Sequence, residues 1–272
     1  MKSKFNYCYC NDFLEICLLE NNNIGLKKCC YLAPFKILSK EEFNQIRDII
    51  DYSNKNSSIT KQIIFKNICN NNCVLGQIKT VAVGLSYACN LNCYHCFYKD
   101  HSYNESQEKY YYNVLYNLKN KNLNKLILNT SGEVFFSWKL LIKYLSSLNQ
   151  NDFKEIVFQT NALLLNKQKI QLLYKISNLT KIKYNFRVSV DAISEKAYQA
   201  TRGGNINKLF KNISYIKTIF GNENISLNFT IKQTNVNELN LVEAFYKEKF
   251  DLNVGIFYDV FDDNMEKIFN QL

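Results

Sequence analysis

The chain alternates short apolar runs, rich in β-branched and aromatic residues, with longer segments whose apolar positions recur at helical spacing. From residue 80 onward this alternation is regular. Short runs of this kind predict buried strands, and the longer periodic segments predict amphipathic helices. The predicted strands are Val81–Ser86, Lys125–Leu128, Glu155–Gln159, Tyr184–Val190, Ile225–Ile231 and Leu252–Tyr258. The predicted helices are Glu108–Asn120, Trp138–Leu148, Lys167–Ser177, Ile206–Phe220, Glu238–Lys249 and Asn264–Leu272.

Repeated strand–helix units predict an α/β fold with a parallel sheet and helices outside it, as an open partial barrel or a doubly wound sheet. The pattern before residue 80 is different. The β-like runs Phe13–Leu19 and Leu26–Tyr31 flank an Asn-rich turn that closes at Gly25, which predicts a hairpin, and a helix is predicted at Lys40–Tyr52. The sequence therefore predicts a small cysteine-rich module, residues 1–78, followed by a core, residues 79–272.

Composition narrows the class of protein. The 272 residues are 47% hydrophobic, which is enough for one full core. The net charge of +10 would suit an acidic partner, but the lysines are scattered and form no basic stripe, so we expect no nucleic-acid binding. No apolar stretch is long enough to span a bilayer, and no apolar signal run follows Met1. We therefore expect a protein of the reducing cytoplasm with no membrane association.

The richest candidate for chemistry is a cysteine triplet, Cys89-Asn-Leu-Asn-Cys93-Tyr-His-Cys96. The C-x3-C-x2-C spacing can place three thiolates on one iron–sulfur cluster and leave a fourth iron open. A structural zinc site usually has four ligands, and His95 would struggle to share a metal with both neighbouring cysteines, so zinc fits less well. A disulfide framework is disfavoured in the cytoplasm, and buried free cysteines are the remaining alternative.

The cysteine run, preceded by the apolar segment Thr80–Tyr87 and followed by Phe97 and Tyr98, resembles the signature of the radical S-adenosylmethionine (radical SAM) enzymes. The resemblance implies a partial (β/α)6 TIM-like barrel and a [4Fe-4S] cluster held by Cys89, Cys93 and Cys96. It also implies that SAM binds at the open iron and that a ferredoxin or flavodoxin supplies electrons. In that oxygen-sensitive family, reductive cleavage of SAM gives a 5′-deoxyadenosyl radical that abstracts hydrogen from a substrate.

Three loops after predicted strands carry further resemblances. Ser131, Gly132 and Glu133 resemble the family's Gly-Gly-Glu-Pro run, which binds the SAM amino group, although the first Gly and the Pro are replaced. Asn161, Ser189 and Asp191 match runs that line the ribose and methionine parts of SAM. Each has an ordinary alternative, since Glu133 could be an acid at a helix start and Asp191 could cap the next helix.

Two further residues complete the implied SAM site. Arg202, within Glu195–Gly204, resembles the helix and R-G-G turn of enzymes with an extra cluster domain, termed SPASM, which implies pairing with the SAM carboxylate. The alternative is a plain surface charge. His95 takes the position of a planar side chain near the adenine, with metal ligation or general-base chemistry as alternatives.

Seven more cysteines precede the core. The hairpin would bring Cys8 and Cys10 near Cys29 and Cys30, which loosely resembles a SPASM-like module. The resemblance implies a second, auxiliary [4Fe-4S] cluster. Its ligands would be Cys10, Cys29, Cys69 and Cys73, with Cys30 or Cys8 as substitutes. SPASM modules usually follow the barrel, so the placement departs from the family, and a zinc site or reduced buried cysteines are alternatives.

Auxiliary clusters in related enzymes often accompany modification of peptides or proteins. The resemblance therefore implies an enzyme that modifies a peptide or protein substrate. Two alternatives stay open: a radical SAM enzyme acting on a small molecule, and a non-catalytic iron–sulfur protein for electron transfer or partner binding. The altered Ser131-Gly132-Glu133-Val134 loop is what keeps the non-catalytic alternative open.

Overall fold

The structure, a computed structural model, describes residues 13–18, 24–27, 36–45, 78–84, 86–96, 105–128 and 131–258. Six strands at its centre pair in sequence order, each parallel to the next. They are β4 (Thr80–Gly84), β5 (Lys125–Leu128), β6 (Glu155–Thr160), β7 (Lys183–Ser189), β8 (Ile225–Ile231) and β9 (Val254–Tyr258). The parallel core predicted from the apolar runs is therefore confirmed, with shifts of one or two residues at most strand ends.

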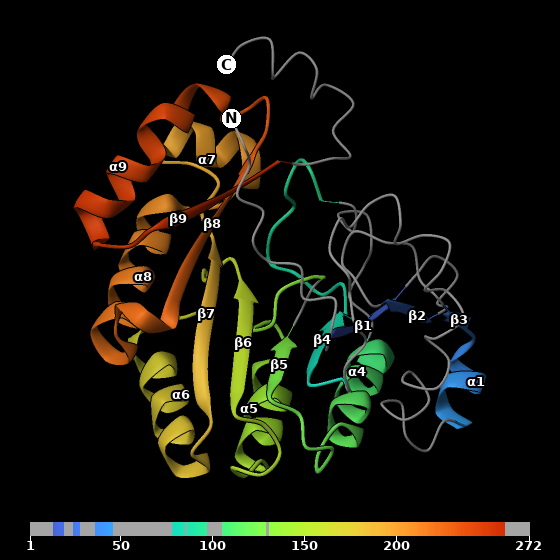
Figure 1. The fold of residues 1–272 in the computed structure, drawn as a ribbon. Coiled ribbons are helices and arrows are strands. Elements are labelled where there is room, and N and C mark those ends of the chain that lie inside the picture. The colour runs from blue at the N-terminus through green and yellow to red at the C-terminus, as the bar shows by residue number, and fades with distance from the viewer. Residues whose placement is uncertain are drawn as a thin grey trace, which may run out of the picture.

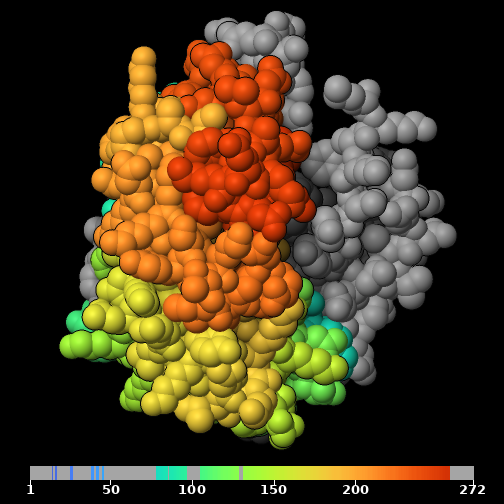
Figure 2. Space-filling view, turned by 90° about the vertical axis from the view of Figure 1, so that its left-hand side faces the viewer, coloured from blue at the N-terminus to red at the C-terminus, as the bar shows by residue number. Residues whose placement is uncertain are grey.

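Helices connect the strands on one side of the sheet (Figure 1). They are α4 (Glu105–Asn117), α5 (Trp138–Ser146), α6 (Lys167–Thr180), α8 (Ile206–Phe220) and α9 (Leu239–Phe250), with a further helix, α7 (Glu195–Arg202), between β7 and α8. In the space-filling view from this side, α6, α8 and α9 close over the sheet in yellow to red (Figure 2). The predicted helix Asn264–Leu272 lies outside the described residues.

Local sequence explains where several helices begin and end. The side chains of Asn166, Ser194 and Asn205 accept hydrogen bonds from the backbone N–H groups of α6, α7 and α8 respectively, which satisfies donors that the first turn leaves open. Helix α4 is shifted three residues toward the N-terminus of its prediction. It ends before Asn120, because Asn120 and Asn122 have the positive φ angles that helices cannot continue through.

The N-terminal hairpin is present and joins the main sheet. Strand β1 (Phe13–Leu18) pairs antiparallel with β2 (Ile24–Lys27), which pairs antiparallel with β3 (Lys36–Leu38). Strand β1 also pairs in parallel with β4, so the described strands form one nine-stranded sheet. Helix α1 (Lys40–Gln45) starts with a reciprocal pair of hydrogen bonds between Ser39 and Glu42. The predicted boundary at residue 78 stays a prediction, since residues 46–77 lie outside the described ranges.

The two faces of the sheet differ in packing. One face packs against the helices through large apolar side chains, and rings of Phe135, Phe158, Phe186 and Phe220 follow one another with centroids 4.8–5.4 Å apart. On the face away from the helices, Ala82, Ile127 and Val157 form a small buried apolar group and lie in register on β4, β5 and β6. The apolar core therefore lies mainly on the helix side, and the other face is free to carry polar residues.

This is the α/β partial barrel that the sequence predicted, with six parallel strands and helices outside. In such folds the loops at the carboxyl ends of the strands carry the functional residues. Within the described ranges, no helix combines the length and the apolar character needed to cross a membrane.

Candidate functional site

The residues singled out from the sequence after residue 80 gather at the carboxyl ends of the strands. The cysteine loop follows β4, residues 131–133 follow β5, Asn161 follows β6, and Asp191 follows β7. Figure 1 shows this cysteine loop, in cyan, at the end of the sheet where α7 also lies. One edge of the sheet therefore presents all of them together.

Backbone hydrogen bonds hold the cysteine loop against α7. Cys93 is buried, whereas Cys89 and Cys96 are partly exposed. The Cys96 N–H donates to the Cys93 carbonyl at 3.1 Å, which closes a tight turn, and the Tyr94 N–H donates to the Thr201 carbonyl on α7 at 3.1 Å. The loop thus presents its three cysteines between β4 and α7.

The thiols of Cys89 and Cys93 favour their protonated form. Burial, with smaller contributions from the nearby Glu133, Cys93 and Cys96, raises the pKa of Cys89 from 9.0 to about 11, and a hydrogen bond from the Leu91 N–H opposes the rise. Burial also raises the pKa of Cys93, although Arg202 opposes the shift. The negative charge of one thiolate therefore disfavours ionisation of the neighbouring thiol. Metal binding requires thiolates, so it would release protons.

The 131–133 loop is packed directly beneath the start of the cysteine loop. Ser131 donates from its hydroxyl to the Ser86 carbonyl at 2.9 Å, and the Glu133 N–H donates to the Ala88 carbonyl at 2.8 Å. Gly132 has a φ of +70°, and a Cβ added there would lie 2.7 Å from the Ser86 carbonyl oxygen. Only glycine suits both the backbone angle and this close approach.

The carboxylate of Glu133 is buried and engaged within the protein. It accepts hydrogen bonds from the Thr160 hydroxyl at 2.6 Å, the Asn161 N–H at 2.7 Å and the Phe135 N–H at 3.2 Å. Burial raises the pKa of Glu133, and these hydrogen bonds limit the rise. Glu133 therefore ties the loop after β5 to the end of β6.

Asn161 connects the end of β6 to the cysteine loop. Its side-chain N–H group donates to the Asn90 side-chain oxygen at 3.0 Å and lies 3.9 Å from the Cys89 sulfur. Its side-chain oxygen accepts from the Leu163 N–H at 2.9 Å. The amide is thus held in a fixed orientation next to Cys89.

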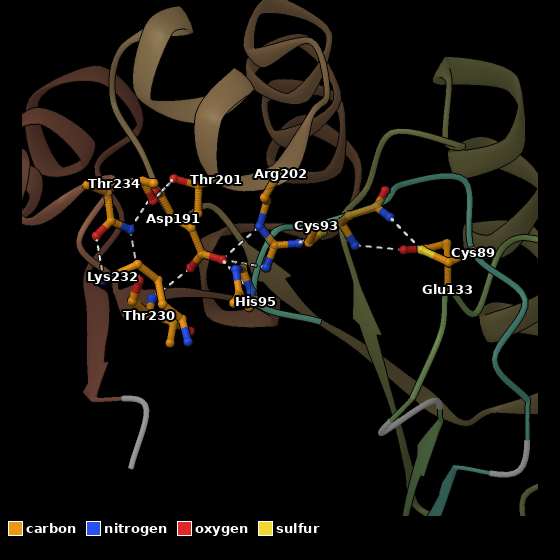
Figure 3. A network of polar contacts seen from close by, with 12 residues as sticks. Cys89, Cys93, His95, Glu133, Asp191, Thr201, Arg202, Thr230, Lys232 and Thr234 are labelled. Atoms are coloured by element: carbon orange, nitrogen blue, oxygen red, sulfur yellow. Dashed lines mark hydrogen bonds and ion pairs between the residues drawn. The ribbon is translucent and has the colours of Figure 1, made fainter. Parts of the chain in front are cut away.

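A buried ion pair joins β7 to α7 beside Cys93 (Figure 3). One carboxylate oxygen of Asp191 accepts from Arg202 Nε at 2.7 Å and Nη2 at 2.5 Å, and the other accepts from the Thr230 N–H at 2.6 Å. Arg202 Nη1 lies 3.9 Å from the Cys93 sulfur. Burial opposes the guanidinium charge, but Asp191 and Cys93 outweigh it and raise the pKa of Arg202. Arg202 is therefore a fixed cation next to Cys93 rather than a plain surface charge.

The remaining candidates lie close to this pair. His95 Nε2 lies 3.9 Å from the Asp191 carboxylate, so the ring points toward the ion pair rather than toward solvent. Ser189 is partly exposed at the last position of β7, two residues before Asp191.

Several residues of the site were not predicted from the sequence. Asn235 donates to the carbonyl oxygens of both Asp191 and Thr230, at 2.8 and 2.9 Å, and so holds the loop after β8 against the loop after β7. Tyr198 on α7 is fully buried within electrostatic range of Cys93, Asp191 and Arg202, and its hydroxyl has no hydrogen-bond partner within the described ranges. These contacts join segments far apart in the chain, and no local sequence motif predicts them.

The residues present fit a three-thiolate cluster with SAM beside it. Three thiols on one loop lie within electrostatic range of one another, and the buried Tyr198 hydroxyl has no hydrogen-bond partner among the described residues. Among the described residues, no three His, Cys, Asp or Glu side chains lie close enough together to share a single metal ion. A cluster offers each thiolate an iron of its own.

The predicted ligands of an auxiliary cluster, Cys10, Cys29, Cys69 and Cys73, lie outside the described residues, as do their substitutes Cys8 and Cys30. The auxiliary cluster therefore stays a prediction.

Comparisons with known proteins give distant matches. No protein-family model matches the chain. A protein of Methanococcus aeolicus named "Probable GTP 3',8-cyclase" is 27% identical over 174 residues, which are 60% of this chain and 54% of that protein. A crystal structure of Streptococcus suis SuiB bound to S-adenosylmethionine matches 71% of this chain and 46% of SuiB, with a TM-score of 0.52 and 15% identity. SuiB bound to its precursor peptide SuiA matches 66% of this chain and 39% of SuiB, with a TM-score of 0.51 and 16% identity.

The chain thus spans about half the length, or less, of the proteins it matches. At these identities the structural likeness shows the fold, which is the partial barrel of the radical SAM type.

Proposed function

We propose that this chain is a radical SAM enzyme that abstracts hydrogen from a peptide or protein substrate. The observation that carries the proposal is the position of the three-cysteine loop. It lies at the carboxyl edge of a parallel sheet, between a buried guanidinium and a fixed amide. Such an arrangement combines soft ligands for iron with hydrogen-bond donors for a polar cosubstrate.

Cys89, Cys93 and Cys96 would hold the [4Fe-4S] cluster. When bound, the reduced cluster supplies the electron that cleaves SAM to methionine and a 5′-deoxyadenosyl radical, which takes a hydrogen atom from the substrate. Ser131, Gly132 and Glu133 pack the loop after β5 against the backbone of residues 86–88, and this packing would hold the start of the cysteine loop in place beside the cosubstrate. His95 and Ser189 would lie along the adenosine part of SAM.

Arg202 is prepared to bind a carboxylate. A guanidinium has five N–H groups. Two donate to Asp191 and one points at Cys93, which leaves one N–H on each terminal nitrogen. That pair of donors suits the bidentate geometry of a carboxylate such as that of SAM. Asp191 positions the guanidinium and keeps it charged.

A peptide substrate is supported by the shared fold with SuiB, whose structure was determined with a precursor peptide. A nucleotide substrate is the second candidate, because the sequence relative is named as a cyclase of GTP. The two can be separated by growing cells in deuterated medium and dividing their extract into a peptide fraction and a small-molecule fraction. Deuterium in 5′-deoxyadenosine would identify the fraction that donates the hydrogen atom.

We include a second cluster held by the N-terminal cysteines and a ferredoxin or flavodoxin as reductant in this proposal. Anaerobic reconstitution should give about eight irons per chain if both clusters form and about four if only one does. Replacing Cys69 and Cys73 by alanine should lower the count from eight to four. A count of about four in the wild-type protein would remove the auxiliary cluster from the proposal, and a count of about eight that stays unchanged in the variant would remove Cys69 and Cys73 as its ligands.

The SAM site itself is tested by electron paramagnetic resonance. The spectrum of the reduced cluster should change when SAM is added to the wild-type protein, because SAM binds an iron that has no protein ligand. Cys93→Ala should lose the change that SAM causes. A cluster spectrum that does not respond to SAM would favour a non-catalytic iron–sulfur protein.

A further inference from the structure

Strand β7 carries a row of polar residues on the face away from the helices. Along β7, Tyr184, Phe186 and Val188 are buried against the helices, and the residues between them are partly exposed. Because side chains alternate along a strand, Asn185, Arg187 and Ser189 share the opposite face. Arg187 lies in register with Gln159 on β6 and Ser226 on β8, so it sits in the middle of the sheet rather than at its edge.

The charge of Arg187 has no partner. No hydrogen bond or ion pair links Arg187 to any other residue in the described part of the chain. The inner residues of the two flanking strands include one carboxylate, Glu155, and it already accepts from Lys125 at 3.2 Å and from Asn185 at 2.6 Å. The side-chain oxygen of Asn185 is itself buried and has no donor.

An unpaired, partly buried guanidinium has lost part of its hydration and gained no counter-charge, which lowers stability. Groups that lower the stability of the free protein in this way commonly serve binding. Here an anion would restore the missing interaction, since guanidinium forms its strongest hydrogen bonds with charged acceptors.

Arg187 also lies near the strand ends that carry the candidate site. Gln159, its neighbour in register, directly precedes Thr160 and Asn161, which contact Glu133 and the cysteine loop. Asp191 follows four residues after Arg187, or about 13 Å along an extended strand. A ligand anchored at Arg187 would therefore extend along the inner face toward the site at the strand ends.

We propose that Arg187 binds the carboxylate of an acidic side chain in the substrate. This rests on the proposed function and deepens it. A nucleoside triphosphate carries several negative charges and is normally held by several cations. Within strands β6, β7 and β8, Arg187 is the one cation on the inner face near the strand ends, since Lys183 lies at the other end of β7; the buried Lys232 follows the end of β8. A single guanidinium can balance the charge of a single carboxylate.

The test uses the full chain, reconstituted, with deuterated cellular peptides separated by charge into acidic and neutral-to-basic pools. The readout is the ratio of deuterated to undeuterated 5′-deoxyadenosine, which corrects for differences in SAM cleavage. Wild-type protein should take deuterium mainly from the acidic pool. Arg187→Gln should lower the ratio about 10- to 100-fold, the value of a charge-assisted hydrogen bond, and Arg187→Lys should recover part of it.

Lys183→Gln is the matched control, because it removes a cation from the same face of the same strand at the far end, and it should leave the ratio unchanged. Thermal unfolding of each variant verifies folding, and Arg187→Gln should melt no lower than wild type. An equal ratio in Arg187→Gln, or deuterium drawn from a nucleotide pool, would overturn the carboxylate site. Absence of 5′-deoxyadenosine in every sample would instead refute the proposed function on which it rests.

Discussion

Replacing Gly132 by alanine tests how closely the loop after β5 is packed beneath the cysteine loop. Gly132 has a φ of +70°, and the added Cβ would lie 2.7 Å from the Ser86 carbonyl oxygen and 2.8 Å from that of Ala88. Carbon and a backbone oxygen do not approach this closely without displacement. Because Ala88 directly precedes Cys89, the displacement would be transmitted to the first cysteine.

The expected loss in the free energy of unfolding has two parts. A left-handed backbone costs a non-glycine residue about 1–2 kcal/mol, and forcing a methyl group into filled space costs about 1–3 kcal/mol. Gly132→Ala should therefore lower the free energy of unfolding by about 2–5 kcal/mol. Gly203 provides the matched control, because its φ is +72° and an added Cβ would meet nothing within 4 Å. Gly203→Ala should cost about 1–2 kcal/mol from the backbone alone.

Urea unfolding of the metal-free protein measures both values on the same scale. The difference between the two variants isolates the contact with the cysteine loop, and we expect it to be about 1–3 kcal/mol. After reconstitution, Gly132→Ala should also bind less iron than Gly203→Ala. Equal losses of stability in the two variants would refute the close packing of the 131–133 loop against the chain before Cys89.

Three further predictions concern buried groups of the site. Asp191→Asn keeps the side-chain shape but leaves Arg202 without a counter-charge, so urea unfolding should show a loss of about 3 kcal/mol; a loss below about 1 kcal/mol would contradict a buried ion pair. Because burial raises the pKa of Cys89 to about 11 from 9.0, its thiolate fraction near neutral pH is small. Its alkylation by iodoacetamide, followed by peptide mass spectrometry, should be roughly 100-fold slower than that of an unperturbed thiol and should keep rising up to about pH 11; a plateau near the ordinary pKa would disprove the shift. Tyr198→Phe removes a buried hydroxyl that has no hydrogen-bond partner among the described residues, so this variant of the metal-free protein should be at least as stable as wild type; a clear loss in thermal unfolding would reveal a bond to the hydroxyl.

The strands and helices were predictable where periodicity is strong and local. Strand β8 and helix α8 have the predicted bounds, because apolar side chains at regular spacing bury one face of each. The parallel pairing of β1 with β4 was not predicted, since a hairpin with an Asn-rich turn says nothing about which sheet edge it will join. Pairing between distant segments depends on the whole packed sheet.

The cysteine triplet could be singled out from the sequence because its spacing is local, and the strand-end residues could be singled out from their order along the chain. The hydrogen-bond and ion-pair partners of these residues could not be predicted. The sequence indicates Glu133 as a polar residue in a loop, but only the structure shows that the Thr160 hydroxyl and the Asn161 N–H occupy its carboxylate. Likewise, Asp191 and Arg202 are eleven positions apart, and burial of both at the end of β7 is what turns them into an ion pair.

Formation of 5′-deoxyadenosine is the measurement that tests the proposed chemistry most directly. The protein would be reconstituted anaerobically with iron and sulfide, reduced with dithionite and incubated with SAM, with Cys93→Ala treated in parallel. We predict 5′-deoxyadenosine and methionine from the wild-type protein and none above background from the variant. A wild-type protein that binds about four irons per chain yet leaves SAM intact would contradict the enzyme and identify an iron–sulfur protein of another kind.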